Sequence, residues 1–182
     1  WVAEEKGYFR AEGLEYEFRG VIQTHKTPDR VGAYPNIAAW REANVSCACH
    51  WTVNVAASNG HGKLYADAYS VAPSGVFVPP ESPIRGPGDL KGVPISVGHQ
   101  SGSHYSTIQG LERYLPKDDI KLSYADGILF GRMEKLIDRQ VPAAAVFNGA
   151  YYFLGQVGFR KGVDTTFMVA SMLNGDPDPE DV

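Results

Sequence analysis

Residues Gly88–Tyr105, which read GDLKGVPISVGHQSGSHY, carry the clearest signal of the fold class. The first five residues are typical of a tight helical turn, and the apolar run Val93–Val97 follows as a buried strand whose proline stands near the first position, where strands tolerate it. Gly98–Gly102 is a glycine-flanked loop, and we expect a helix over residues 103–115 behind it. A strand, a short loop and a helix in this order are the repeating unit of an α/β fold.

The same alternation extends along the chain in both directions. Apolar runs and alternating patterns predict strands at residues 14–18, 45–49, 64–71, 75–78, 120–124, 143–147 and 167–170. Helical spacing predicts further helices over residues 1–9, from about residue 52, and over residues 131–139 and 151–157. We therefore predict an α/β protein with mainly parallel strands.

Composition and net charge limit the classes of partner that the protein can have. The chain has 182 residues, of which 43% are hydrophobic and 21% charged, and its net charge is −4. This length suits one ordinary domain or two small lobes. Because like charges form no block, nucleic acid and anionic membrane surfaces are disfavoured as main partners. No window approaches the ~20 apolar residues of a membrane span, so we expect none in this chain.

Both cysteines lie in one short stretch, Asn44–Trp51, which reads NVSCACHW. Cys47 and Cys49 are two residues apart and are poorly placed to bridge each other, so we expect free thiols. A thiol at the start of a helix beside an imidazole would have a lowered pKa and be nucleophilic. By their position alone, we favour Cys49 and His50 as the residues that face the site. Two alternatives remain: one cysteine is a core residue, or His50 and Trp51 simply line an apolar ligand pocket.

A metal site needs three or four converging ligands. One strand end supplies two at most, so His25, His99 or His104 would have to complete a site with the cysteines. The spacing matches no standard metal motif. We therefore expect neither a metal nor another cofactor.

A second candidate site is Ser101–His104. Backbone N–H groups at a helix start, together with the hydroxyls of Ser101 and Ser103, can accept an anion; the alternative is an ordinary serine N-cap. Asn148 is a further candidate because it follows the strand at residues 143–147.

The order of segments resembles the type-2 periplasmic binding proteins of sulfonate, nitrate and taurine transporters. Their relatives include the thiamine-pyrimidine synthases and an aryl-sulfinate desulfinase. Trp1–Leu14 looks like the family's first helix and second strand, and Ser82–Ile84 followed by Gly88–Val97 looks like the crossover into its second lobe. Gly98–Tyr105 stands where the family carries a Gly/Ser-rich ligand loop, so the resemblance covers essentially the whole chain.

The resemblance implies two lobes, with lobe 1 over residues 1–72 plus a return strand near 165–175 and lobe 2 over residues 76–160. It also implies that the first strand and a C-terminal part are missing from this chain. One departure stands out. Where family members usually carry an aspartate at the end of the third strand, this chain has Ser46 or a neighbour, and the thiol and imidazole cluster stands at the ligand position.

The resemblance implies capture of a small anionic or aromatic organic molecule for an ABC importer, in the periplasm or at the cell surface, with the permease as a candidate partner. We expect the ligand to meet the residues that lie between the lobes: Cys49, His50, Trp51, Ser101, Gly102, Ser103, His104 and Asn148. The alternative is a cytoplasmic enzyme on the same scaffold, such as a desulfinase, decarboxylase, hydrolase or pyrimidine synthase. It would use Cys49 or Cys47 with His50, and His25 and Arg30 are further candidates because the desulfinase relatives carry a histidine and an arginine in that loop.

Overall fold

The computed structural model describes residues 2–16, 45–60, 62–124 and 129–174. Its helices are α1 (Val2–Glu5), α2 (Tyr8–Ala11), α4 (His50–Ser58), α5 (Gly102–Leu111), α6 (Leu129–Ile137) and α7 (Asn148–Gln156), with 3₁₀ turns η2 (Pro87–Leu90) and η3 (Lys117–Asp119). Its strands are β1 (Val45–Cys49), β2 (Gly62–Ala72), β3 (Ser74–Val78), β4 (Pro94–Ser96), β5 (Lys121–Ser123), β6 (Ala143–Phe147), β7 (Arg160–Asp164) and β8 (Phe167–Asn174). None of the helices in these segments is both long and apolar enough to cross a membrane.

The strands of the described segments form two sheets, one of three strands in the order β1-β8-β2 and one of five in the order β5-β4-β6-β3-β7. The predicted α/β class is confirmed. In the five-stranded sheet only β3 runs against the other strands, because β4 pairs in parallel with β5 and β6 while β3 is antiparallel to β6 and β7. The three-stranded sheet is antiparallel throughout, which the prediction of mainly parallel strands did not anticipate.

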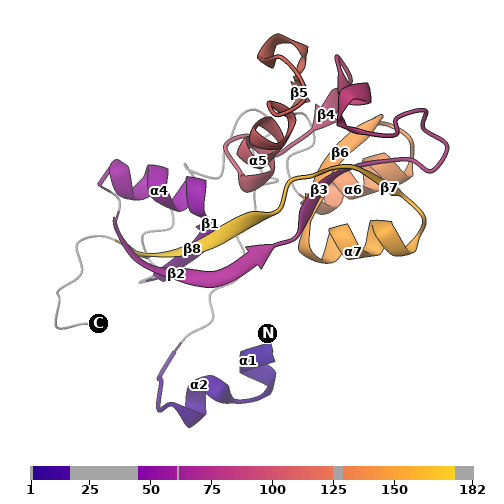
Figure 1. The fold of residues 1–182 in the computed structure, drawn as a ribbon. Coiled ribbons are helices and arrows are strands. Elements are labelled where there is room, and N and C mark those ends of the chain that lie inside the picture. Colours follow the sequence, from indigo (N-terminus) through magenta and orange to yellow (C-terminus); the bar gives the residue numbers. More distant parts are fainter. Residues whose placement is uncertain (1, 17–44, 61, 125–128, 175–182) are drawn as a thin grey trace.

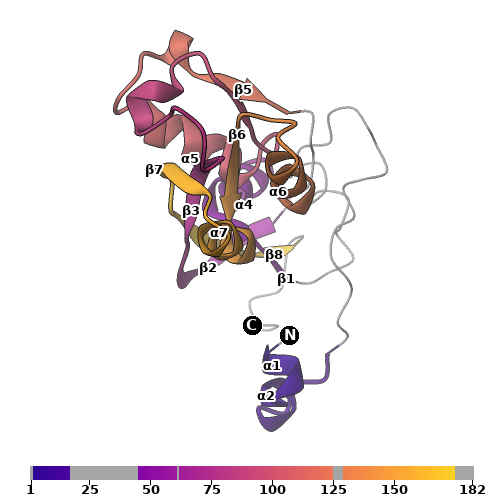
Figure 2. The ribbon, with the colours of Figure 1, turned by 90° about the vertical axis from the view of Figure 1, so that its right-hand side faces the viewer.

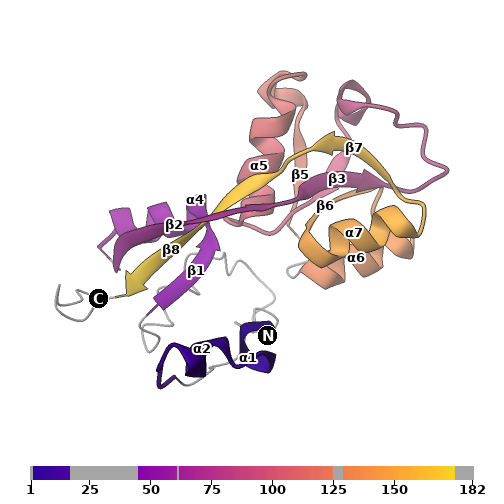
Figure 3. The ribbon, with the colours of Figure 1, turned by 60° about the horizontal axis from the view of Figure 1, so that its bottom comes forward.

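The five-stranded sheet is covered on both faces, as the alternation of side chains along its strands requires. Val76 and Val78 of β3 pack with Leu111 of α5 in one core cluster, whereas Phe77 packs with Leu136 of α6 and Leu154 of α7 in another. Figure 2 and Figure 3 show α5 on one side of these strands and α6 on the other. The result is a three-layer unit with a core on each face.

Helix α4 packs along the three-stranded sheet, against β8, β1 and β2 (Figure 1). It follows β1 directly, since β1 ends at Cys49 and α4 begins at His50. Val53 and Ala56 of α4 are fully buried. Trp51 is half-buried near the start of this helix.

The chain crosses between the two sheets twice, from β2 to β3 at Pro73 and from β7 to β8 at residues 165–166. The two crossings lie side by side, as Figure 1 shows. The buried hydroxyls of Ser74 and Thr165 are 2.8 Å apart, and the Thr165 N–H donates to the Ser74 carbonyl at 2.9 Å. These bonds fasten the crossings to each other.

Several boundaries differ from the sequence-based prediction. Strand β7 was not predicted, because in Arg160–Asp164 only Val163 is buried and charged residues dominate. Residues 14–16 form no strand, and residues 17–18 of the strand expected there lie outside the described residues. Helix α4 begins two residues before the expected start, and α5 ends at Leu111.

Candidate functional site

The loop before α5 is closed by two serine hydroxyls. The Ser101 hydroxyl donates to the Gly98 carbonyl at 2.7 Å, and the Gly98 N–H donates to Ser103 Oγ at 3.0 Å. The two serine oxygens are 2.7 Å apart. The single hydroxyl proton of Ser101 is donated to the Gly98 carbonyl. In the hydrogen bond between the two serines, the Ser103 hydroxyl is therefore the donor and Ser101 Oγ the acceptor.

This arrangement changes the roles that the sequence suggested for the serines. Ser101 is the residue before α5, but its side chain makes no capping hydrogen bond. Both hydroxyl protons are used within the loop. The donors left for an anion are therefore backbone N–H groups at the helix start, because those of Gly102 and Ser103 have no acceptor within the helix.

Arg132 of α6 brings a positive charge to the same place. Its side chain is only 2% exposed. Its Nε donates to the carbonyl of Ala145 in β6 at 3.2 Å, and its Nη2 lies 3.4 Å from Ser103 Oγ. A buried guanidinium beside a helix N-terminus adds to the positive end of the helix dipole, so this position favours a negative charge.

The end of β1 packs directly against the start of α5. A Cβ placed on Gly102 would lie 2.9 Å from Cys49 Cβ and 2.8 Å from the Phe167 ring. The His50 and Trp51 rings are in contact in a tilted arrangement with 3.9 Å between centroids, and the Trp51 ring lies 6.1 Å from Tyr105 of α5. The structure thus brings together Cys49–Trp51 and Ser101–His104, which lie fifty residues apart in sequence.

His104 sits in a cluster of rings at the same helix start. Its Nδ1 accepts the Gln100 N–H at 3.1 Å, and its Nε2 lies 3.1 Å from the Tyr124 hydroxyl. Because Nδ1 accepts, the neutral ring carries its proton on Nε2. The His99 ring is 5.7 Å away. Burial, and then the charge of His99, hold the pKa of His104 below its ordinary value.

The remaining candidates are placed as follows. Asn148 is exposed, and its backbone N–H donates to the Pro73 carbonyl at 2.9 Å, so it lies beside a crossing. Cys47 pairs with Ser171 through its backbone, and its side chain is outside the description. His25 and Arg30 lie outside the described residues. Within the described segments, no three His, Cys, Asp or Glu side chains are grouped to hold a metal ion.

Sequence reasoning missed Arg132, Tyr105 and Phe167. The sequence does indicate that Arg132 is buried, because this residue lies three positions after Leu129 and four before Leu136, on the apolar face of an amphipathic helix. Tyr105 lies in the first turn of the predicted helix, but nothing in the sequence pairs it with Trp51. Phe167 lies 6.0 Å from Trp51 by ring centroids, a contact that depends on the return of β8.

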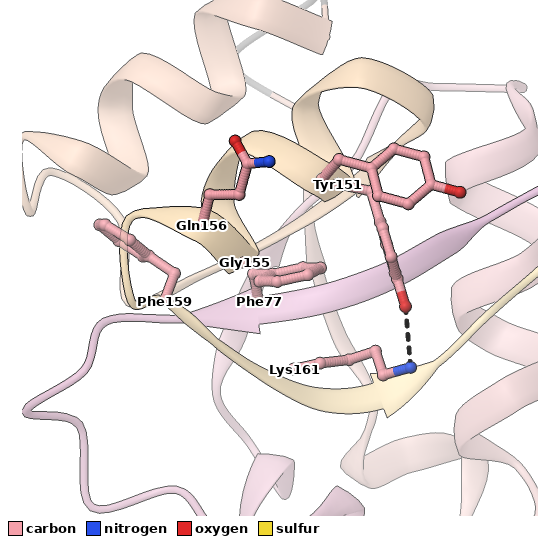
Figure 4. Close-up of a pocket in the computed structure, with 7 residues that line it drawn as sticks. Phe77, Tyr151, Gly155, Gln156, Phe159 and Lys161 are labelled. Carbon is pink, nitrogen blue, oxygen red and sulfur yellow. Dashed lines mark hydrogen bonds between the residues drawn. The ribbon is translucent and has the colours of Figure 1, made fainter.

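A cavity of about 350 Å³ lies elsewhere, on the α7 side of the five-stranded sheet (Figure 4). Phe77, Tyr151, Phe159 and Lys161 are among its lining residues. The Lys161 ammonium is held by the Tyr151 hydroxyl at 3.0 Å and by Asp164 at 2.7 Å. We do not place the site here, because the Lys161 ammonium is already paired with Asp164. The sequence leaves Tyr151 and Tyr152 of this cavity open as core residues or ligand wall, and the other candidate residues lie elsewhere.

Comparison with solved structures defines the class of the fold. No protein-family model and no curated protein sequence matches the chain. Among solved structures, periplasmic solute-binding proteins of ABC transporters have the same fold, and the chain shares it.

Particular examples are two alkanesulfonate-binding proteins called SsuA. The one from Xanthomonas axonopodis pv. citri, bound to MOPS, is 21% identical with a TM-score of 0.60 over 76% of this chain and 52% of its own. The one from Escherichia coli is 18% identical with a TM-score of 0.61 over 77% of this chain and 50% of its own. The arginine-, lysine- and histidine-binding protein ArtJ from Geobacillus stearothermophilus is 16% identical with a TM-score of 0.59 over 95% of this chain and 71% of its own. The chain therefore spans about half the length of the sulfonate-binding proteins.

Proposed function

We propose that the chain binds a small anionic or aromatic organic molecule between its two sheets, as the solute-binding protein of an ABC importer. One observation carries the proposal. The end of β1 and the start of α4 contact the N-terminus of α5 through Cys49 and Gly102, so both candidate stretches border one region. Phe167, the first residue after the crossing from β7 to β8, also contacts Gly102, so this region borders both sheets.

Three features of the site favour an anionic ligand: free backbone N–H groups, the helix dipole and a guanidinium. The first N–H groups of α5 point out of the helix, and the helix dipole places partial positive charge there. The guanidinium of Arg132 lies behind Ser103. A sulfonate or carboxylate offers several oxygens to such donors, and charge-assisted hydrogen bonds are stronger than neutral ones.

An aromatic portion is supported by the rings that border the helix start. Trp51 and Tyr105 come from opposite sides of the contact, and the His50 ring lies against Trp51. Offset or edge contacts with such rings stabilise an aromatic ligand by about 0.5–1.5 kcal/mol beyond its area burial. The combination favours a ligand that carries a ring and one negative charge.

The importer role rests on the shared fold and on the ligands of the similar proteins, which are sulfonates and amino acids. A periplasmic or cell-surface location and a permease partner follow from the same role. Closure of the two sheets around the paired crossings would trap the ligand. The enzyme alternative with Cys49, Cys47 and His50 stays a prediction and is tested below through the Cys49 thiol.

Isothermal titration calorimetry with three matched compounds tests the binding proposal. Benzenesulfonate carries a ring and a charge, ethanesulfonate only the charge, and benzenesulfonamide the ring without the charge. We expect benzenesulfonate to bind most tightly and benzenesulfonamide to bind at least tenfold more weakly, a difference of about 1.4 kcal/mol. Equal affinity for the neutral compound, or no binding of any of the three, would contradict the proposal.

A further inference from the structure

We propose that His104 is a pH-operated latch on residues 98–101, which its neutral ring holds in place and its protonated ring releases. Through these residues, acid would weaken ligand binding. The effect on ligand rests on the function proposed above, whereas the latch itself can be tested without ligand.

The latched residue is Gln100. Its φ is +54°, in the left-handed region that non-glycine residues adopt at a cost. Its N–H donates to His104 Nδ1 at 3.1 Å. Gly98, Ser101 and Ser103 bond to one another, whereas the backbone N–H of Gln100 is joined to α5 through the His104 ring.

Protonation and this bond exclude each other. A protonated imidazole carries a hydrogen on both nitrogens and accepts no hydrogen bond. In the imidazolium form, the Nδ1–H of His104 would point at the Gln100 N–H. Protonation therefore breaks this contact, and the Gln100 N–H loses its acceptor on α5.

The groups named here that face His104 are aromatic rings, a guanidinium and a thiol, and none of them is a carboxylate that would stabilise the protonated ring. From the loop, His99 stacks at 5.7 Å; from α5 itself, Tyr105 stacks at 4.8 Å; and after β5, Tyr124 lies at 5.1 Å, all between ring centroids. From α6, the Arg132 guanidinium reaches the adjoining Ser103. From the other sheet, Cys49 contacts Gly102, and the His50 ring lies against Trp51, which neighbours Tyr105.

Two further effects act in the same direction. His104 is in the first turn of α5, where the helix dipole disfavours a positive charge. Burial, followed by the charge of His99, lowers the His104 pKa. The latch is therefore closed at neutral pH and opens only in acid.

The sign of the pH effect separates the latch from simple attraction. A protonated His104 near a bound anion would strengthen binding through its charge. Loss of the conformation of residues 98–101 would instead weaken binding of the anion. A sulfonate keeps its charge throughout this pH range, so a change in its affinity reports on the protein.

The decisive experiment is amide hydrogen exchange at Gln100, expressed as a protection factor between pH 7.5 and 5. In the wild-type protein we expect protection to fall by up to about tenfold for each pH unit below the His104 pKa, the limit for uptake of one proton. His104→Asn keeps an acceptor at the position of Nδ1 but does not titrate, so its protection should not change with pH. His104→Ala lacks the acceptor and should show low protection at every pH.

Binding of benzenesulfonate supplies the second readout. We expect its affinity for the wild-type protein to fall between pH 7.5 and 5 and its affinity for His104→Asn to stay level. The latch is wrong if wild-type protection at Gln100 does not follow His104 titration, or if benzenesulfonate affinity rises in acid. If benzenesulfonate binds at no pH, the proposed function fails for this ligand, while the exchange data still decide the latch.

Discussion

Gly102 packs against Cys49 with no room for a side chain between them, since a Cβ on Gly102 would lie 2.9 Å from the Cβ of Cys49. The first residue of α5 therefore rests on the last residue of β1. This contact joins the two sheets at the helix N-terminus that we propose as the anion site. Glycine is needed at position 102 because Cys49 and Phe167 lie too close for a side chain, and not because of the backbone conformation there.

Gly102→Ala should destabilise the protein by about 1–3 kcal/mol, because the added methyl overpacks the space between Cys49 and Phe167. Urea unfolding measures this loss. Gly149→Ala is a matched control, since Gly149 lies in the first turn of α7 and an added Cβ there meets nothing within 4 Å. The close contact would be disproved if both alanine variants had the free energy of unfolding of the wild-type protein.

Arg132→Met should weaken benzenesulfonate binding by about tenfold or more, because it removes the buried charge next to Ser103. It should also lower stability by about 1–3 kcal/mol, since the Ala145 carbonyl loses a buried donor. Arg113→Met changes the net charge equally at an exposed position and serves as the control. If the two variants bound benzenesulfonate with equal affinity, Arg132 would not be part of the binding site.

The strand, loop and helix of Val93–Leu111 could be predicted because their signals are local. A buried apolar run, a glycine-flanked loop and a helical pattern follow one another within twenty residues. Strand β7 could not be predicted, because it lies at the sheet edge and exposes Lys161 and Asp164. Its pairing with β3 is a long-range contact that no local pattern encodes.

The candidate site was predictable as two separate stretches but not as one place. Cys49–Trp51 and Ser101–His104 each show unusual chemistry in sequence. Their contact depends on β8, which returns from the other sheet to pair with β1 and places Phe167 against Gly102. The burial of Arg132 likewise depends on β6 and α5, which lie in different parts of the chain.

Alkylation of Cys49 tests whether this residue faces the ligand. In a Cys47→Ser background, we expect bound benzenesulfonate to slow the reaction of Cys49 with iodoacetamide, because the half-buried thiol borders the proposed site. Benzenesulfonamide at the same concentration should give no protection. Rapid alkylation at pH 6–7 in the absence of ligand would instead favour the enzyme alternative, which requires an activated thiol.

The stability of the protein should depend on pH through His104. Its pKa in the folded protein is below the ordinary value of 6.5. Between these two values the unfolded chain holds a proton that the folded chain lacks, so the free energy of unfolding decreases as pH falls below 6.5. The contribution of the neutral His104 ring to the free energy of unfolding is fully present above pH 6.5.

Chemical denaturation of the wild-type protein and of His104→Asn between pH 8 and 5 measures this contribution. The difference between the two proteins should be constant above pH 7 and shift against the wild-type protein in acid. A difference that does not vary over the whole range would show that His104 titrates alike in both states.

Mapping benzenesulfonate onto the protein by NMR chemical shifts tests the central claim most directly. A ligand between the two sheets should produce its largest shift changes at the amides of Gly102 and Ser103 and at the Trp51 indole. The account is contradicted if the largest changes fall instead on the cavity of Phe77, Tyr151 and Phe159, or if saturating ligand changes no signal.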